Sequence, residues 1–482
     1  MEDRGRIPVG PPITKPLPSY WQDPKSPLAN VVEPEVDKAT QLYDYAIIGS
    51  GISGTMIAYD LFKKDPGSRI VMFEAREICS GATGRNGGHT KAASYRTYTQ
   101  HVQELGKDEA LRIARLEYAN IVETHQLAND LDLACESQIC NTVDLIYDTT
   151  TFEVGKTAIQ ALGSDATKEE GNEGEMAWYE IYDKDEALQQ NFHVEAQNQN
   201  PANTEKEQLA GAFKYTAGRI HAYRFTTGVL KECVKKGLQL CANSPVHDIL
   251  PSKQTAMWDV FTQFNSVTAR NVILATNGYT PYVLKSVQGA IVPLRGQITV
   301  QKPGTASKLQ CTLPTTYSFI YRNGYEYMIP RPLPDGSQHI VIGGGLGRLP
   351  DAGATEFGTV DDGSLNPKIS TYLNGTLTGY FGSDNWGETC KEDEEKRVVQ
   401  EWTGIMGATA DGRPFVGEVP GKKGMWVSAG FNGHGMVLCL KAAEALVEMV
   451  RDGVKPDWFP ESFLITPERL EQCKFRGRMD MQ

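Results

Sequence analysis

The 482-residue sequence has few cysteines, no long apolar run and no excess of positive charge. Its nine cysteines are scattered and form no C-x-x-C pair, and its eight histidines show no H-E-x-x-H spacing. We therefore predict no metal site and a reducing, cytoplasmic location. No apolar stretch reaches the roughly 18 residues of a membrane span, so we expect no membrane association. The net charge of -12 argues against nucleic acid as the main partner.

The length of the chain predicts two domains rather than one small core. Residues 1–40 are rich in proline and charge, and we expect an arm that lies on the surface or is partly disordered. Segments of nucleotide-binding type alternate with strand-rich segments. The predicted division is a nucleotide-binding domain from residues 41–105, 205–290 and 396–455, a second domain from 106–204 and 291–395, and a tail at 456–482.

The clearest motif is a glycine-rich turn between a short apolar strand at residues 45–48 and a helix. Gly49 permits the tight turn, Gly51 lets the backbone approach a pyrophosphate, and Gly54 lets the helix sit close to the strand. The helix N-terminus offers free N–H groups to the phosphates. Glu74 ends the next strand, where a carboxylate can bind ribose hydroxyls. The pattern predicts a dinucleotide site.

Further glycine-rich segments occur at residues 79–89, 402–414 and 430–436. The first suits the close approach of a planar ligand, and its Arg85 can neutralise phosphate. The alternative is a flexible surface loop. Residues 430–436 precede the last long helix, and such a turn offers the N–H groups that the electron-rich edge of a reduced flavin needs.

Together these segments resemble the flavin oxidoreductases of the D-amino-acid oxidase, glycine oxidase and sarcosine oxidase superfamily, over residues 43–453. The most similar subgroup is the gamma-glutamylputrescine oxidase type, through residues 80–88, 218–221, 402–404 and 430–435. The resemblance implies an α/β (α+β) fold. A Rossmann-like FAD-binding domain is built from discontinuous segments, and a substrate domain carries a mainly antiparallel sheet. The implied cofactor is FAD.

The resemblance and the glycine motifs assign a set of cofactor-binding residues. They place the adenosine end of FAD at residues 49–54 and Glu74, with Val246 at the adenine, and the isoalloxazine near residues 85–89 and 432–436. The full set is Gly49, Ser50, Gly51, Ser53, Gly54, Glu74, Ala75, Arg76, Gly81, Ala82, Thr83, Arg85, Asn86, Gly87, Gly88, His89, Val246, Ala275, Thr276, Asn277, Gly278, Asp411, Gly430, Asn432, Gly433, His434, Gly435 and Met436.

Three positions depart from the family pattern. Met406 stands where amino-acid-oxidising members carry an arginine for the substrate carboxylate, which favours an amine without that anchor. Gly404 stands where sarcosine-oxidase-like members attach FAD through a cysteine, so that linkage is excluded. Val341 aligns with the lysine that promotes oxygen reactivity in those members, which leaves oxidase and dehydrogenase both open.

The candidate catalytic residues are His434, Tyr327, Arg331 and Trp402. His434 can act beside the flavin or simply structure its glycine turn. Tyr327 and Trp402 can form an aromatic cage for the substrate together with Tyr279, Tyr321 and Tyr325, or belong to the core. For Arg331, and for Arg295 near the domain junction, the alternative to an anion site is an ion pair.

These residues predict an FAD-dependent oxidation of the C–N bond of a primary or secondary amine to an imine, with molecular oxygen as electron acceptor and hydrogen peroxide as product. An amino-acid oxidase or an amine dehydrogenase of the same fold is the first alternative. A non-catalytic flavin-binding protein is the second. The substrate and the oligomeric state are left open by the sequence.

Overall fold

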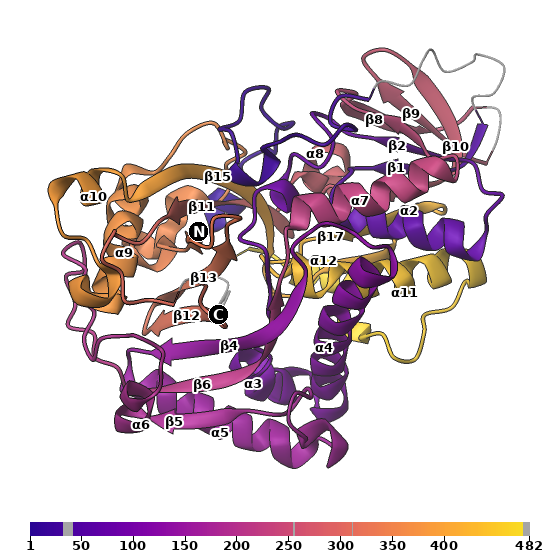
Figure 1. Ribbon diagram of the computed structural model, residues 1–482. Helices are drawn as coiled ribbons and strands as arrows, with labels where there is room; N and C mark the ends of the chain where they lie inside the picture. The colour runs from indigo at the N-terminus through magenta and orange to yellow at the C-terminus, as the bar shows by residue number, and fades with distance from the viewer. Residues whose placement is uncertain (32–41, 254–255, 311, 476–482) are drawn as a thin grey trace.

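The computed structural model describes residues 1–31, 42–253, 256–310 and 312–475. Two sheets lie side by side, each with helices packed against it (Figure 1). The predicted fold class is therefore confirmed: a Rossmann-like sheet stands next to a second, mainly antiparallel sheet. Part of the predicted arm (32–40) and tail (476–482) lies outside the described residues, as do positions 41, 254–255 and 311.

The first sheet has the strand order β16-β17-β10-β1-β2-β7 and is parallel from β17 to β7. Its parallel strands are nearly continuous apolar runs because both faces are covered. Successive side chains enter opposite cores: Ile47 faces one cluster and Ile48 the other. The strands are β1 (Leu42–Ile48), β2 (Ile70–Phe73), β7 (Gln239–Cys241), β10 (Ser266–Leu274), β16 (Phe415–Glu418) and β17 (Met425–Ala429), with β8 (Val246–Pro251) and β9 (Trp258–Thr262) added antiparallel beside β10.

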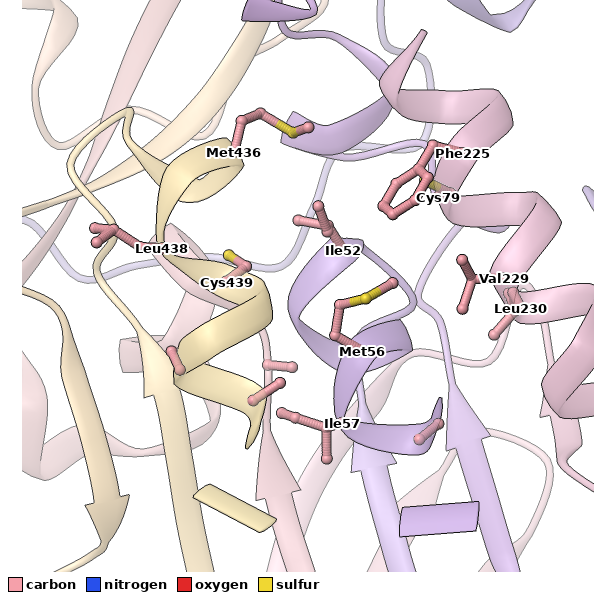
Figure 2. Close-up of a cluster of buried hydrophobic side chains, with 14 of the residues drawn as sticks. Ile52, Met56, Ile57, Cys79, Phe225, Val229, Leu230, Met436, Leu438 and Cys439 are labelled. Atoms are coloured by element: carbon pink, nitrogen blue, oxygen red, sulfur yellow. The ribbon is translucent and has the colours of Figure 1, made fainter. Parts of the chain in front are cut away.

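Three helices cover one face of this sheet: α2 (Ile52–Lys64), α7 (Ala222–Lys235) and α11 (Cys439–Asp452). Figure 2 shows α2 lying between the other two, with Ile52 and Met56 directed into the shared apolar cluster. The starts of α2 and α11 come together at the carboxyl ends of the strands. Both helices therefore begin at the edge where open α/β sheets bind ligands.

The second sheet has the strand order β15-β11-β14-β13-β12-β4-β6-β3, with β5 beside β6, and its one parallel pair among the described strands is β12 with β4. The strands are β3 (His89–Thr90), β4 (Gln138–Ile146), β5 (Glu180–Asp183), β6 (Gly211–Arg219), β11 (Ile291–Gln301), β12 (Thr316–Tyr321), β13 (Gly324–Pro332), β14 (Gln338–Gly343) and β15 (Val398–Thr409). The remaining helices are α1 (Glu2–Gly5), α3 (Tyr95–Leu105), α4 (Lys107–Asp130), α5 (Thr149–Asp165), α6 (Lys184–Gln189), α8 (Thr280–Val283), α9 (Pro367–Trp386), α10 (Lys391–Glu395) and α12 (Pro467–Gln472).

The strands of the two sheets alternate along the chain more often than the predicted domain ranges do. Strands β3, β6 and β15 lie in ranges predicted for the nucleotide-binding domain, yet all three belong to the second sheet. Helix α4 lies in a range predicted for the substrate domain, yet it packs on α11. The chain crosses between the sheets at each of these points, so the domain boundaries stay a prediction.

The N-terminal arm is packed against the body over its described residues. Trp21 is 4% exposed and belongs to the main core cluster, and Val9 and Ala29 are also buried. The Leu17 amide donates to the carbonyl of Asp362 at 2.8 Å, and Ser19 Oγ donates to the carbonyl of Gly84 at 2.7 Å. This part of the arm is thus a structural element, not a disordered segment on the surface.

Within the residues that the structure describes, no helix has both the length and the apolar character that crossing a membrane requires.

Candidate functional site

A long cavity runs from the glycine turn after β1 to the face of the second sheet. At the turn, Gly49 has φ +108°, and a Cβ there would lie 2.5 Å from the carbonyl oxygen of Ala275. A Cβ on Gly54 would lie 2.0 Å from the carbonyl oxygen of Gly49. Only glycine permits these approaches, so the first and last glycines have the geometric roles that the motif predicts.

Glu74 stands at the same end of the cavity and is fixed by neighbouring groups. Its Oε2 accepts hydrogen bonds from Ser50, at 3.1 Å from the amide and 2.7 Å from Oγ, and its Oε1 accepts from the Arg76 amide at 3.2 Å. Each oxygen of a carboxylate has further acceptor capacity. The carboxylate lines the cavity beside Val246, so the pair fits a ribose and an adenine ring.

The second glycine-rich segment also lines the cavity. A Cβ on Gly81 would meet no atom within 4 Å, whereas one on Gly87 would lie 2.7 Å from the ring of Tyr327. His89 lines the wall with its Nε2 hydrogen-bonded to Thr316 Oγ1 at 2.7 Å. Burial lowers the pKa of His89 well below its usual value, so its ring is neutral. The segment thus brings bare backbone and a neutral ring to the cavity.

Arg85 is buried and directed away from solvent. It donates from Nε to the carbonyl of Ser80 at 2.8 Å and from Nη1 to the carbonyl of Thr403 at 2.9 Å, and Nε lies 3.5 Å from Asp362. Burial lowers the pKa of Arg85 to about 10. Asp362 also accepts from Arg76 at 3.0 Å. One carboxylate thus serves two arginines, and a phosphate contact by Arg85 stays a prediction.

The glycine turn at residues 430–436 is held by two asparagines. Asn432, at φ +52°, accepts from the Thr409 amide at 2.7 Å, and Asn277 Oδ1 accepts from the Gly430 amide at 3.0 Å. His434 follows, lines the cavity, and its Nδ1 lies 2.9 Å from the carbonyl oxygen of Asn432. Burial lowers the pKa of His434, so its ring is neutral. Because a carbonyl can only accept, Nδ1 carries the proton and Nε2 is an acceptor.

Most predicted cofactor residues line this cavity: Gly49, Gly51, Ser53, Glu74, Ala75, Arg76, Gly81, Ala82, Thr83, Arg85, Asn86, Gly87, His89, Val246, Ala275, Thr276, Asn277, Gly433, His434, Gly435 and Met436. The others lie behind its wall: Ser50, Gly54, Gly88, Gly278, Asp411, Gly430 and Asn432. Among these, Asp411 instead accepts from Arg469 of α12, at 2.8 Å and 3.0 Å.

Two of the predicted catalytic residues do not line the cavity. Trp402 is fully buried in β15, and its indole N–H donates to the carbonyl of Arg85 at 2.8 Å. Arg331 forms a two-point ion pair with Glu136 at 2.9 Å and packs over the ring of Tyr20. Both therefore have the structural roles that were the alternatives in the sequence.

Tyr327 lines the cavity, as do Tyr279 and Tyr325, whereas Tyr321 turns away and donates to Glu326 at 3.0 Å. Arg295 lines it too, but its Nε pairs with Glu356 at 2.6 Å, the structural ion pair that was the alternative in the sequence. Of the aromatic residues predicted for the cage, only these three tyrosines line the cavity.

The three departures from the family pattern differ in their location. Met406 and Gly404, both in β15, line the cavity, and the Met406 side chain lies against Gly296 of β11. Val341 is fully buried within β14 and does not line it. A change at Met406 therefore acts on the cavity directly, whereas one at Val341 acts through the core.

Two cations in the wall were missed by the sequence reasoning: Lys91 and Arg96. Lys91 pairs with Asp144 of β4 and donates to Ser318 Oγ of β12 at 2.5 Å. Arg96 lies in the first turn of α3. Neither belongs to a glycine motif, and Asp144 lies 53 residues from Lys91 in the chain. The one available signal was that both follow the second glycine-rich segment closely.

The cavity suits a dinucleotide at one end and a small polar molecule at the other. Among the described residues, no cluster of three or more histidine, cysteine or carboxylate side chains could hold a metal. The bare glycine backbone, the fixed carboxylate of Glu74 and the unfilled space at Gly81 fit FAD.

Comparison with known proteins gives the same family. Residues 44–449 match the family of FAD dependent oxidoreductases (DAO). Glycine oxidase from Geobacillus kaustophilus is 22% identical over 404 residues, 83% of this chain and 90% of that protein. A probable oxidoreductase, OrdL, from Haemophilus influenzae is 23% identical over 264 residues, 54% of this chain and 56% of that protein. The chain thus spans little more than half the length of this second relative.

Solved structures agree at the level of the fold. The crystal structure of the Geobacillus kaustophilus glycine oxidase has a TM-score of 0.67 at 19% identity, covering 89% of this chain and 99% of that one. L-proline dehydrogenase from P. horikoshii has a TM-score of 0.66 at 17% identity, covering 90% and 98%. The chain belongs to the DAO family of FAD-dependent oxidoreductases, and its cofactor is FAD.

Proposed function

We propose that this oxidoreductase oxidises the C–N bond of a primary or secondary amine to an imine, with oxygen as electron acceptor and hydrogen peroxide as second product. FAD supplies the hydride acceptor when it is bound. The imine then hydrolyses in water. The glycine oxidase relatives, and the fold shared with an iminodiacetate oxidase from Chelativorans (TM-score 0.63, 16% identity), support an amine or amino-acid substrate.

The observation that carries this proposal is the continuity of the cavity. One wall joins Glu74 and the glycine turn after β1 to His434, Tyr327 and Met406. A dinucleotide bound at the first end leaves the second end for a substrate.

The chain contributes binding and one hydrogen-bond acceptor. His434 lines the cavity with a neutral ring, and because its Nδ1 donates to the Asn432 carbonyl, its Nε2 is an acceptor for the N–H of a substrate amine. Tyr327 and Met406 supply an apolar surface against the carbon chain of the substrate. Met406 offers no charge to a carboxylate at its own position.

The test is a product balance with the FAD-loaded protein in air. For an accepted amine we expect hydrogen peroxide and the carbonyl product in equal amounts. Flavin reduction without peroxide, restored by an artificial electron acceptor, would instead identify a dehydrogenase. The absence of any product with every amine and amino acid would leave a non-catalytic flavin-binding protein and overturn the proposal.

A further inference from the structure

The start of the N-terminal arm is tied to the body of the protein. The Gln288 side chain donates from Nε2 to the carbonyls of Gly5 and Ile7, at 2.9 Å and 3.0 Å. Arg4 of α1 donates from Nε to the carbonyl of Phe357 at 2.7 Å. Because Phe357 lines the cavity, the arm is fixed at its beginning next to the cavity wall.

The arm is fixed a second time further along the chain. The Leu17 amide donates to the carbonyl of Asp362. Ser19 Oγ donates to the carbonyl of Gly84, which belongs to the second glycine-rich segment. Trp21 then enters the main core cluster. This second anchor therefore joins the arm both to the core and to a segment that forms part of the cavity wall.

The residues between these two anchors, 8–16, form a strap across one side of the cavity. Pro11 and Pro12 of the strap both line the cavity. The carbonyl of the next residue, Ile13, accepts a hydrogen bond from Arg76 Nη1 at 3.3 Å. The strap is thus held at both of its ends and once more in its middle.

Arg76 identifies the part of the cavity that the strap crosses. Its amide donates to Glu74 at 3.2 Å, and its Nη1 donates to Asp362 at 3.0 Å as well as to the strap. Glu74 stands at the end of the cavity that fits the ribose and adenine of FAD. Pro11 and Pro12, one and two residues from the contact with Arg76, therefore lie at the adenosine end.

Two properties of proline suit this position. Its ring is apolar and its nitrogen carries no hydrogen, so a ligand can cover it without leaving a backbone donor unpaired. Its fixed φ also reduces the conformational entropy that the strap loses when it is ordered over a ligand. Pro11 is exposed and Pro12 is half-buried, so both have surface that a dinucleotide can cover.

We propose that the strap is part of the FAD site, and that Pro11 and Pro12 contact the adenosine portion of the bound cofactor. The match to the DAO family begins at residue 44, so the strap lies outside the matched residues and adds to the site that they build. Bound FAD in turn holds the strap closed, because opening it would lose these contacts. The inference concerns the cofactor and does not depend on the proposed reaction.

The first experiment uses the full chain prepared without FAD and titrates it with ADP, which carries the adenosine and the two phosphates of FAD. Calorimetry gives the ADP affinity of the wild type and of Pro11→Ala/Pro12→Ala, which loses both rings. We expect the affinity to fall about tenfold in this variant, because apolar surface that covers the ligand is removed. No binding of ADP to the wild type would overturn the inference.

The matched control is Pro8→Ala/Pro18→Ala. It also removes two proline rings from the arm, but at exposed positions that do not line the cavity. We expect this control to bind ADP as the wild type does. Equal losses of affinity in the two variants would show a general loosening of the arm, and no loss in either would show that the prolines do not touch the ligand. Both results would overturn the inference.

Hydrogen exchange of the wild type tests the strap without any substitution. The amides of residues 13–17 should exchange more slowly when ADP is bound, because contact with the ligand disfavours opening of the strap. The exposed turn between β9 and β10, which does not line the cavity, serves as the internal control and should exchange at the same rate in both states. An unchanged rate at residues 13–17 with ADP bound would refute the contact.

Discussion

At the scale of the residue, glycines define the cofactor end of the cavity. Gly49 and Gly54 stand where a Cβ would clash with backbone carbonyl oxygens. These roles could be predicted from the sequence because a turn of this kind needs glycine for local reasons, with no partner far away in the chain. The same holds for Glu74, which is placed by the strand that precedes it.

Gly54→Ala tests this local constraint. The new Cβ would stand 2.0 Å from the carbonyl oxygen of Gly49, so the turn has to shift. Strain of this kind costs about 1–3 kcal/mol, and we expect FAD affinity to fall about tenfold or more. The FAD content of the purified protein measures it. Gly163→Ala in α5, where a Cβ meets nothing within 4 Å, is the control and should keep its full FAD content.

Side chains that act across the fold were harder to predict. Trp402, Arg331 and Asp411 each pair with a group far away in the sequence: the Arg85 carbonyl, Glu136 and Arg469. Residue type alone does not tell an active-site tryptophan or arginine from a structural one. Lys91 and Arg96 line the cavity but were not predicted, because no spacing rule connects them to Asp144.

Asp411→Asn is predicted to weaken the protein in a pH-dependent way. Burial would raise the pKa of Asp411, but the ion pair with Arg469 outweighs burial and lowers the pKa from 3.8 to about 2. A depressed folded-state pKa contributes stability above 3.8 that is lost as the pH falls through about 2. We expect a loss of about 2 kcal/mol at neutral pH. Urea unfolding at pH 7 and pH 3 measures it.

The free energies of unfolding of the wild type and of Asp411→Asn should approach each other as the pH falls toward 2. A constant difference in the free energy of unfolding at every pH would show that the carboxylate charge contributes nothing.

At the scale of the element, the strand–turn–helix unit formed as its pattern predicts, because its apolar strand and glycines are local signals. The N-terminal arm did not follow its pattern. Its proline content gave no indication that Trp21 enters the core, in edge contact with His221 at 4.7 Å between ring centroids. A single buried aromatic residue can hold a polar segment against the core, and one residue produces no periodic pattern in the sequence.

Trp21→Ala measures what the arm contributes. The side chain is 4% exposed within the main core cluster. Its removal leaves a large cavity, so we expect a loss of about 3–5 kcal/mol in the free energy of unfolding. Chemical denaturation followed by circular dichroism gives the value. The control is Phe264→Ala, at a side chain 66% exposed, with an expected change of under about 0.5 kcal/mol. Similar values for the two variants would mean that the arm is merely laid on the surface.

At the scale of the whole molecule, the pairing of a Rossmann-like sheet with a mainly antiparallel sheet was predictable through the family resemblance. The exact division was not, because β3, β6 and β15 leave their neighbours in sequence to join the second sheet. These crossings of the chain between the sheets help to form the cavity. They bring His89 and Met406, on strands of the second sheet, to the same cavity as the glycine turn of the first.

The most direct test of the proposed reaction is the visible spectrum of the FAD-loaded protein, recorded without oxygen while amines and amino acids are added. We predict that at least one of these amines or amino acids bleaches the flavin band, and that air restores it. A flavin band that stays unchanged with every amine and amino acid would contradict the proposed amine oxidation.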